Sequence, residues 1–165
     1  MKRLVALALL VAVATGGWIW WKSDRRQIER ALGRLERACE KDGAESPLSL
    51  VGRAGTLLEA FAPGLLVRAA PYAGTLTDAR ELVGVIERYR ATASRIRITD
   101  DERQLDVGPN GTAEMTLLVR VSGERGSGPG REAFRARLYW VRTDGGWKIR
   151  EVEVLEVLET TGLFF

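Results

Sequence analysis

The stretch Phe134–Ile149, with the sequence FRARLYWVRTDGGWKI, decides the fold class of this chain. Its first half alternates apolar side chains with Arg and Tyr, which is the period of two that a strand shows when one face packs on a core. Asp144-Gly145-Gly146 is a tight-turn sequence, and Trp147 resumes the alternation beyond it. The stretch therefore predicts a long antiparallel hairpin. Past Ile149 the alternation loses phase at Arg150-Glu151, which indicates a β-bulge in the last strand.

Two earlier strands follow the same pattern. Ala113–Val121 alternates apolar and polar residues after the turn sequence Pro109-Asn110-Gly111. Residues 95–107 alternate as well, except at Asp100-Asp101-Glu102, where three acidic residues predict a second bulge. The glycine-rich stretch Gly123–Gly130 is expected to form a flexible loop. These strands extend the hairpin into an antiparallel meander.

Three stretches before the strands carry apolar residues at helical spacing. The first covers Asp24–Lys41, the second starts at Ser46-Pro47 and stops at Pro63-Gly64, and the third starts at Thr75 or Thr77. Their apolar stripes are Ile28, Ala31, Leu32, Leu35, Ala38 and Cys39; Leu48, Val51, Ala54, Leu58 and Phe61; and Ala79, Leu82, Val83, Ile86 and Tyr89. The sequence thus predicts an α+β domain in which three helices, with one short strand among them, cover one face of a curved antiparallel sheet.

An apolar segment precedes the domain. Leu4–Trp21, LVALALLVAVATGGWIWW, is eighteen residues long, has no charge and follows Met1-Lys2-Arg3. As a helix it would extend about 27 Å, close to the thickness of a hydrocarbon core. Cleavage of a secretory signal at Ala12-Val13-Ala14 is the alternative. The three tryptophans that end the segment suit a membrane interface, so we expect an uncleaved transmembrane helix over residues 1–22.

The orientation of this anchor follows from two opposed signals. Counting Lys and Arg at each end favours a cytoplasmic domain, because Lys22, Arg25 and Arg26 follow the segment. A tiny basic N-terminus before an apolar core is instead typical of an exported chain. We expect a single-pass protein of the inner (cytoplasmic) membrane with residues 23–159 in the periplasm or otherwise outside the cytoplasm. We expect residues 160–165 to be an apolar tail that packs over the domain, touches the membrane or docks on a partner; a disordered end is the alternative.

Composition excludes several classes of function. The net charge is +3 and the isoelectric point about 9.3, but the basic excess lies beside the apolar segment, so we expect no nucleic-acid binding. The chain has no histidine, which removes His-based triads and nearly all zinc sites. Its single cysteine, Cys39, cannot form an internal disulfide and is expected to be a small buried hydrophobe.

Three passages resemble the nuclear transport factor 2-like (NTF2-like) superfamily, which includes SnoaL-like polyketide cyclases and ketosteroid isomerase. They are Gly74-Thr75 with the helix Glu81–Tyr89, the strand Ala113–Val121, and the hairpin Asp144–Ile149. The resemblance extends from about residue 26 to residue 158 and implies a cone-shaped domain. Because this fold hosts enzymes, carriers and assembly modules, the resemblance implies a fold and leaves the activity open.

Enzymes of this superfamily place Asp, Tyr or Tyr-His-Asp sets inside the cone, and the lack of histidine excludes the last set. Tyr89 lies on an apolar helical stripe, Tyr72 lies in a turn near the cone mouth, and the inward strand positions are apolar. We therefore assign no catalytic residue, no metal and no cofactor, and favour a non-enzyme. An isomerase- or cyclase-like enzyme that uses Tyr89 or Tyr72 with a carboxylate remains an alternative.

The leading hypothesis is a membrane-anchored assembly module of a bacterial cell-envelope complex, similar in layout to certain subunits of type IV secretion systems. Its partners would be membrane lipids, through the N-terminal helix, and other envelope proteins. The outward sheet face is the candidate interface, including that of a homodimer, and its alternative is a solvated face with cross-strand ion pairs. The interface candidates are Leu118, Arg120, Arg135, Arg137, Tyr139 and Arg150.

A carrier of an apolar small molecule or lipid is the second hypothesis, because the cone interior is predicted to be apolar. Gly52 and Gly55 would leave room for a ligand, whereas a core completely filled by large side chains would leave none. The candidate pocket residues are Phe61, Tyr72, Tyr89, Met115, Phe134 and Trp140.

Overall fold

The computed structural model describes residues 24–69, 74–126 and 128–161. The expected anchor over residues 1–22, Tyr72 and the end of the apolar tail lie outside the described residues. Among the helices that are described, none is long and apolar enough to span a membrane.

The described ranges contain three helices. The N-terminal helix covers residues 24–39, α2 covers Pro47–Glu59 and α3 covers Ala79–Thr92. Ser46 caps α2, as predicted, by accepting a hydrogen bond from the backbone N–H of Ser49 at 3.3 Å. The cap of α3 is Asp78, which accepts from the N–H of Arg80 at 2.8 Å. The prediction of Thr75 or Thr77 as its cap is wrong, because Thr75 is still paired in β3 and Thr77 lies one residue before the cap.

Seven strands form one sheet across the described ranges, in the order β1-β4-β5-β6-β7-β2-β3. Their bounds are β1 Lys41–Asp42, β2 Phe61–Ala69, β3 Gly74–Leu76, β4 Ala93–Val107, β5 Thr112–Arg125, β6 Gly128–Thr143 and β7 Gly146–Thr160. β2 runs parallel to β7, so the sheet is mixed and the prediction of a purely antiparallel sheet is wrong. Alternation along a strand reports which face is buried, and it carries no information on the direction of a neighbour that is distant in sequence.

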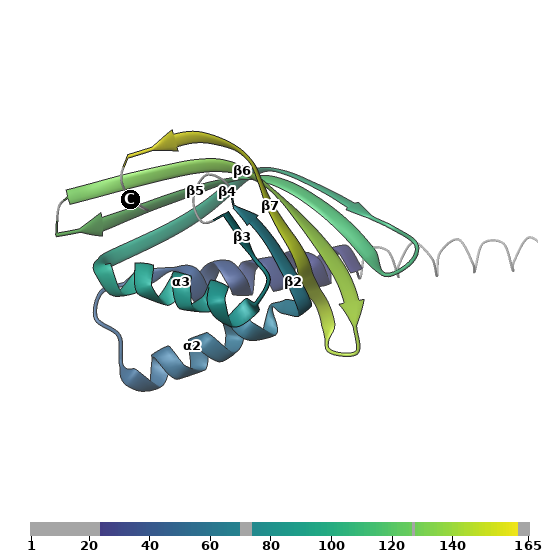
Figure 1. Ribbon diagram of the computed structural model, residues 1–165, viewed down its shortest axis with the longest axis horizontal. Helices are drawn as coiled ribbons and strands as arrows, with labels where there is room; N and C mark the ends of the chain where they lie inside the picture. The colour runs from purple at the N-terminus through teal and green to yellow at the C-terminus, as the bar shows by residue number, and fades with distance from the viewer. Residues whose placement is uncertain (1–23, 70–73, 127, 162–165) are drawn as a thin grey trace, which may run out of the picture.

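Both predicted bulges are present. The pairing of β4 with β5 shifts between Asp101 and Gln104, and Glu102 has a positive φ of 55°. In β7, Ile149 pairs with Trp140 and Glu151 pairs with Tyr139, so Arg150 is the extra residue. The loop expected around residues 123–130 is shorter than predicted, since pairing continues to Arg125 and Gly128. The long strands curve, and Figure 1 shows the helices lying beneath the hollow of the sheet.

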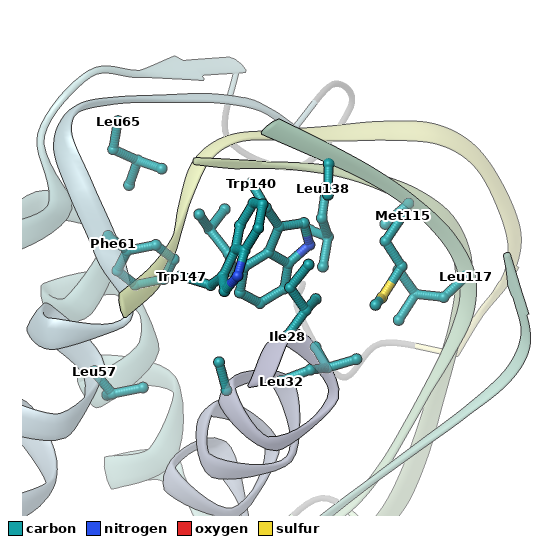
Figure 2. Packing of buried hydrophobic residues seen from close by; sticks show 14 of the residues in the cluster. Ile28, Leu32, Leu57, Phe61, Leu65, Met115, Leu117, Leu138, Trp140 and Trp147 are labelled. Atoms are coloured by element: carbon teal, nitrogen blue, oxygen red, sulfur yellow. The ribbon is translucent and has the colours of Figure 1, made fainter. Parts of the chain in front are cut away.

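The core lies between the N-terminal helix and the concave face of the sheet. Figure 2 shows the rings of Trp140 and Trp147 side by side above Ile28 and Leu32 of that helix. The buried polar side chain of Asp24 closes this region by accepting hydrogen bonds from Trp147 Nε1 and Arg142 Nη1, each at 3.1 Å.

The predicted apolar stripe of α2 is wrong in part. The helix ends at Glu59, and Phe61 is buried in β2 instead of completing a helical face. Leu57 is completely buried, whereas Leu48 and Val51 are 87% and 75% exposed. An apolar residue at helical spacing is buried only where another element packs against it. The first turn of α2, with Leu48 and Val51, extends beyond the elements that cover Leu57.

Candidate ligand cavity

A cavity of about 350 Å³ lies between α3 and the concave face of the sheet. Its size is at the lower end of the range of small-molecule sites, about 300–1,000 Å³. The lining residues are Cys39, Val67, Ala69, Leu76, Leu82, Val85, Ile86, Tyr89, Arg90, Ile96, Ile98, Val119, Val121, Phe134, Val152 and Val154. Aliphatic side chains predominate, and the described residues contribute no Asp, Glu or His to the lining.

Arg90 is the charged residue of this lining, and its guanidinium is bound by carbonyl oxygens and a carboxylate of the cavity wall. The side chain is 2% exposed, and its Nη1 donates to the carbonyl oxygens of Ala38 at 3.0 Å and of Cys39 at 2.7 Å, and also to that of Glu40. Its Nη2 contacts Glu45 Oε1 at 2.6 Å. A cation at a helix C-terminus satisfies carbonyls that lack helical partners and opposes the helix dipole. Arg90 therefore fastens α3 to the end of the N-terminal helix.

Tyr89 is the aromatic polar residue of the lining. Burial raises the pKa of its hydroxyl to about 12, with a further contribution from Glu132, although the guanidinium of Arg125 opposes the rise. That guanidinium lies over the ring, 4.8 Å from its centre. The hydroxyl is therefore neutral at physiological pH, and it suits hydrogen bonding better than base catalysis.

Cys39 contributes a thiol to the same lining. Burial raises the pKa of this thiol to about 12, even though Arg90 opposes the rise. Because the thiolate is the nucleophile, such a cysteine reacts slowly. This agrees with the expectation that Cys39 serves as a small buried hydrophobe.

The candidate pocket residues divide into two groups. Tyr89 and Phe134 line the cavity. Phe61, Met115 and Trp140 lie instead in the core cluster and are at most 5% exposed.

Several lining residues were not singled out by the sequence reasoning. The strand alternation places Ile98, Val152 and Val154 on the inward face, but it carries no information on whether an inward side chain meets a helix or a void. The glycines of α2 play no part in the cavity: a Cβ at Gly52 or Gly55 would meet nothing within 4 Å, so neither glycine makes room for a neighbouring element.

The convex face carries the interface candidates. Arg120 pairs with Asp101, Arg135 with Glu102 at 3.1 Å, and Arg137 with Glu114 at 3.1 Å. Arg137 Nη1 also donates to the hydroxyl of Tyr139 at 3.3 Å. Leu118 is 5% exposed and Arg150 is exposed. The face thus carries several cross-strand ion pairs and one buried leucine. Its role as an interface stays a prediction.

No known protein family and no curated protein matches this chain in sequence. Solved structures do match in shape. An NTF2-like protein with a cystatin-like fold from Novosphingobium aromaticivorans is 18% identical with a TM-score of 0.68, covering 90% of this chain and 91% of its own. A putative scytalone dehydratase from the same organism is 16% identical with a TM-score of 0.69, covering 84% and 87%. A type 2 hexachlorocyclohexane dehydrochlorinase is 12% identical with a TM-score of 0.65, covering 87% and 93%.

These likenesses establish the fold. The chain has the NTF2-like α+β fold, in which helices cover the concave face of a curved, mixed sheet. Proteins of this fold include enzymes and binding proteins, so the fold alone does not choose between the two kinds of function.

Proposed function

We propose that this domain is a non-catalytic binding module that holds an apolar small molecule or a lipid in the cavity between α3 and the sheet. The supporting observation is the lining itself, which is predominantly aliphatic and surrounds a volume of about 350 Å³. Burying apolar surface of a ligand there is favourable by about 25 cal/mol per Å². Tyr89 and Phe134 add aromatic surface to this lining.

The positions of the ionisable groups favour binding over catalysis. A general base must lie within hydrogen-bond reach of a substrate proton, and the part of the lining that the structure describes offers no carboxylate or imidazole. The buried carboxylate of Asp24 lies in the core, where it accepts hydrogen bonds from Trp147 and Arg142. The hydroxyl of Tyr89 and the thiol of Cys39 are both protonated at neutral pH.

Thermal unfolding of the full chain with naphthalene tests this proposal. A ligand that binds the native state alone raises the unfolding temperature as its concentration rises. We expect this rise in the wild type and a smaller rise in Val154→Phe, whose larger side chain takes up part of the cavity. Leu155→Phe is the matched control, because Leu155 is the next residue of β7, is 38% exposed and does not line the cavity. Equal shifts in all three proteins, or none in the wild type, would sink the proposal.

The second candidate function is the assembly module, anchored by residues 1–22 in the inner membrane with the domain outside the cytoplasm. The observation that favours it is the apolar surface of α2, where Leu48 and Val51 are 87% and 75% exposed. Apolar side chains gathered on one exposed helical turn are typical of a protein contact.

Crosslinking of the full-length protein in its native membrane tests the assembly module. Other envelope proteins recovered at fixed stoichiometry by the wild type, but not by a Leu48→Asp, Val51→Asp double variant, would support assembly through α2. Identical recovery by the two proteins would exclude this face. Recovery of no protein partner by the wild type would contradict the assembly function.

A further inference from the structure

The N-terminal helix carries a stripe of arginines on the side that faces away from the core. This arginine stripe consists of the exposed side chains of Arg26, Arg30, Arg34 and Arg37, which line one open hollow along the helix. Arg37 is nine residues from the completely buried Ile28, and that spacing places two side chains on opposite sides of a helix. Of the described residues that line the hollow, Glu29 is the acidic one. The stripe therefore presents a surplus of positive charge to solvent.

The guanidinium groups of the arginine stripe are available to an external anion. None of the four forms an ion pair with another residue that the structure describes. Two further carboxylates of this helix are engaged elsewhere. Asp24 accepts hydrogen bonds from Trp147 and Arg142, and Glu36 pairs with Arg103 at 3.1 Å. These carboxylates therefore do not neutralise the stripe.

The start of α2 presents apolar side chains to solvent. Leu48 is nine residues from the buried Leu57, which places it on the outward side of the helix, where it is 87% exposed. Val51, one turn further along, is 75% exposed. Arg53 is the charged residue within this part of α2, and it pairs with Glu45 at 2.6 Å. The outward side of α2 is therefore apolar and carries no unpaired charge at its start.

The arginine stripe and α2 adjoin each other. Arg34 and Arg37 line a second hollow together with Arg53 and Thr56 of α2. Thr56 lies eight residues from Leu48, or about 12 Å along the helix axis. Figure 1 shows α2 on the side of the helices that faces away from the sheet. The helical side of the domain thus combines unpaired cations with exposed apolar side chains.

This combination matches the surface of an anionic lipid bilayer. Guanidinium groups bind phosphate oxygens through paired, charge-assisted hydrogen bonds. Each Lys or Arg close to an anionic membrane surface strengthens association about fivefold. Apolar side chains of a surface helix enter the boundary between head groups and acyl chains. A nucleic acid would supply phosphates to the arginine stripe but would leave Leu48 and Val51 in water, so the exposed apolar residues favour a bilayer.

We propose that the arginine stripe and the start of α2 together dock the folded domain on an anionic lipid surface. The arginines bind lipid phosphates, and Leu48 and Val51 enter the head-group boundary. This inference goes beyond the ligand cavity, and it gives α2 a lipid partner in place of the protein partner of the assembly module. It concerns the folded domain, and it holds whether or not residues 1–22 span the membrane.

An environment-sensitive dye on α2 tests this docking in the full chain. Acrylodan, whose emission moves to shorter wavelength when the dye leaves water, is attached at Leu48→Cys in a Cys39→Ala background, so that the chain has one thiol. The protein is incorporated into vesicles of phosphatidylcholine alone, or of an equal mixture of phosphatidylcholine and phosphatidylglycerol. An apolar anchor would enter both vesicles, so a difference between them reports the folded domain. The control label is at Leu155→Cys, directly after the inward-facing Val154 of β7.

The label at residue 48 should emit at shorter wavelength on the anionic vesicles than on phosphatidylcholine, and the label at residue 155 should emit alike on both. Sodium chloride at about 0.5 M, which shortens the screening length to about 4 Å, should reverse the shift. The stripe variant Arg30→Gln, Arg34→Gln should lower the ratio of docked to undocked protein about 25-fold. Its matched control, Arg120→Gln, Arg135→Gln, removes two charges from the convex face and should leave the ratio nearly unchanged.

Equal emission from residue 48 on the two kinds of vesicle would overturn the proposal, and so would a shift that the stripe variant leaves intact. A shift seen in native cell membranes with their proteins, but absent on the protein-free anionic vesicles, would overturn lipid docking and assign α2 to a protein partner. The cavity takes no part in these measurements, so the proposed ligand binding is tested separately.

Discussion

The two halves of the concave face are filled in different ways. Where the concave face meets the N-terminal helix, Trp140, Trp147 and Met115 pack into a continuous core. Where it faces α3, the sheet presents shorter aliphatic side chains and leaves about 350 Å³ open. The alternation of inward and outward residues is the same in both halves. Whether an inward position becomes core or cavity is therefore decided by side-chain size and by the distance to the helix opposite.

Truncation in the filled half should have the largest effect. Trp140 is 1% exposed, so Trp140→Ala should lower the free energy of unfolding by about 3–5 kcal/mol, through lost burial and a new void. Val119→Ala, on the cavity side, should cost about 1 kcal/mol or less because Val119 already borders empty space. Urea unfolding followed by circular dichroism measures both. Similar losses for the two variants would contradict the division of the face into a packed and an open half.

Removal of the cation in the cavity wall should have the next largest effect. Arg90→Met would leave the carbonyls at the end of the N-terminal helix without their donor and would take one cation from Glu45. Breaking a buried ion pair on one side costs about 3 kcal/mol. Arg88→Met is the control, since Arg88 is exposed on the same helix. Equal urea midpoints for the two variants would show that Arg90 does not fasten the wall.

Low pH should reduce the stability that Glu45 contributes to the same cavity wall. Burial would raise the pKa of Glu45, but hydrogen bonds from Arg53 and Arg90 outweigh it and hold that pKa below the ordinary 4.5. The folded state therefore binds fewer protons than the unfolded state. The stabilisation that ionised Glu45 gives the folded state is complete above about pH 4.5 and is lost as the pH falls through the lowered pKa. The stability advantage of the wild type over Glu45→Gln should shrink between pH 6 and pH 3. An advantage that stays constant over this range would contradict the pairing.

Substitutions on the convex face should change the free energy of unfolding least. Arg135 and Glu102 pair at 3.1 Å with side chains 39% and 57% exposed, so Arg135→Ala should change the free energy of unfolding by less than about 1 kcal/mol. Sedimentation of the full chain in detergent, wild type against Arg135→Glu, tests the homodimer prediction on the same face. A wild-type dimer that the variant breaks would support it, and a monomer in both proteins would reject it.

The sequence carried much of the fold because the fold depends on local patterns. Alternation identified the inward residues Phe134 and Trp140, and the loss of phase after Ile149 located a bulge that the structure contains. The parallel pairing of β2 with β7 joins strands that are distant in sequence, so no local pattern reports it.

The candidate site was harder to predict for a related reason. Phe134 and Trp140 have the same inward phase on one strand, yet Phe134 lines the cavity and Trp140 fills the core. The difference depends on how closely the opposing helices approach the sheet. That separation is a property of the assembled domain, and the alternation along one strand does not contain it.

The amount of apolar ligand that the full chain retains after purification from its native cells tests the central claim most directly. Native mass spectrometry would compare the wild type with Val154→Phe, whose phenyl ring obstructs part of the cavity, and with Leu155→Phe, a substitution at the next residue of β7, which does not line the cavity. The account predicts a discrete small molecule or lipid bound to the wild type and to Leu155→Phe, and its absence from Val154→Phe. A wild type without ligand, or the same ligand retained in all three proteins, would contradict the account.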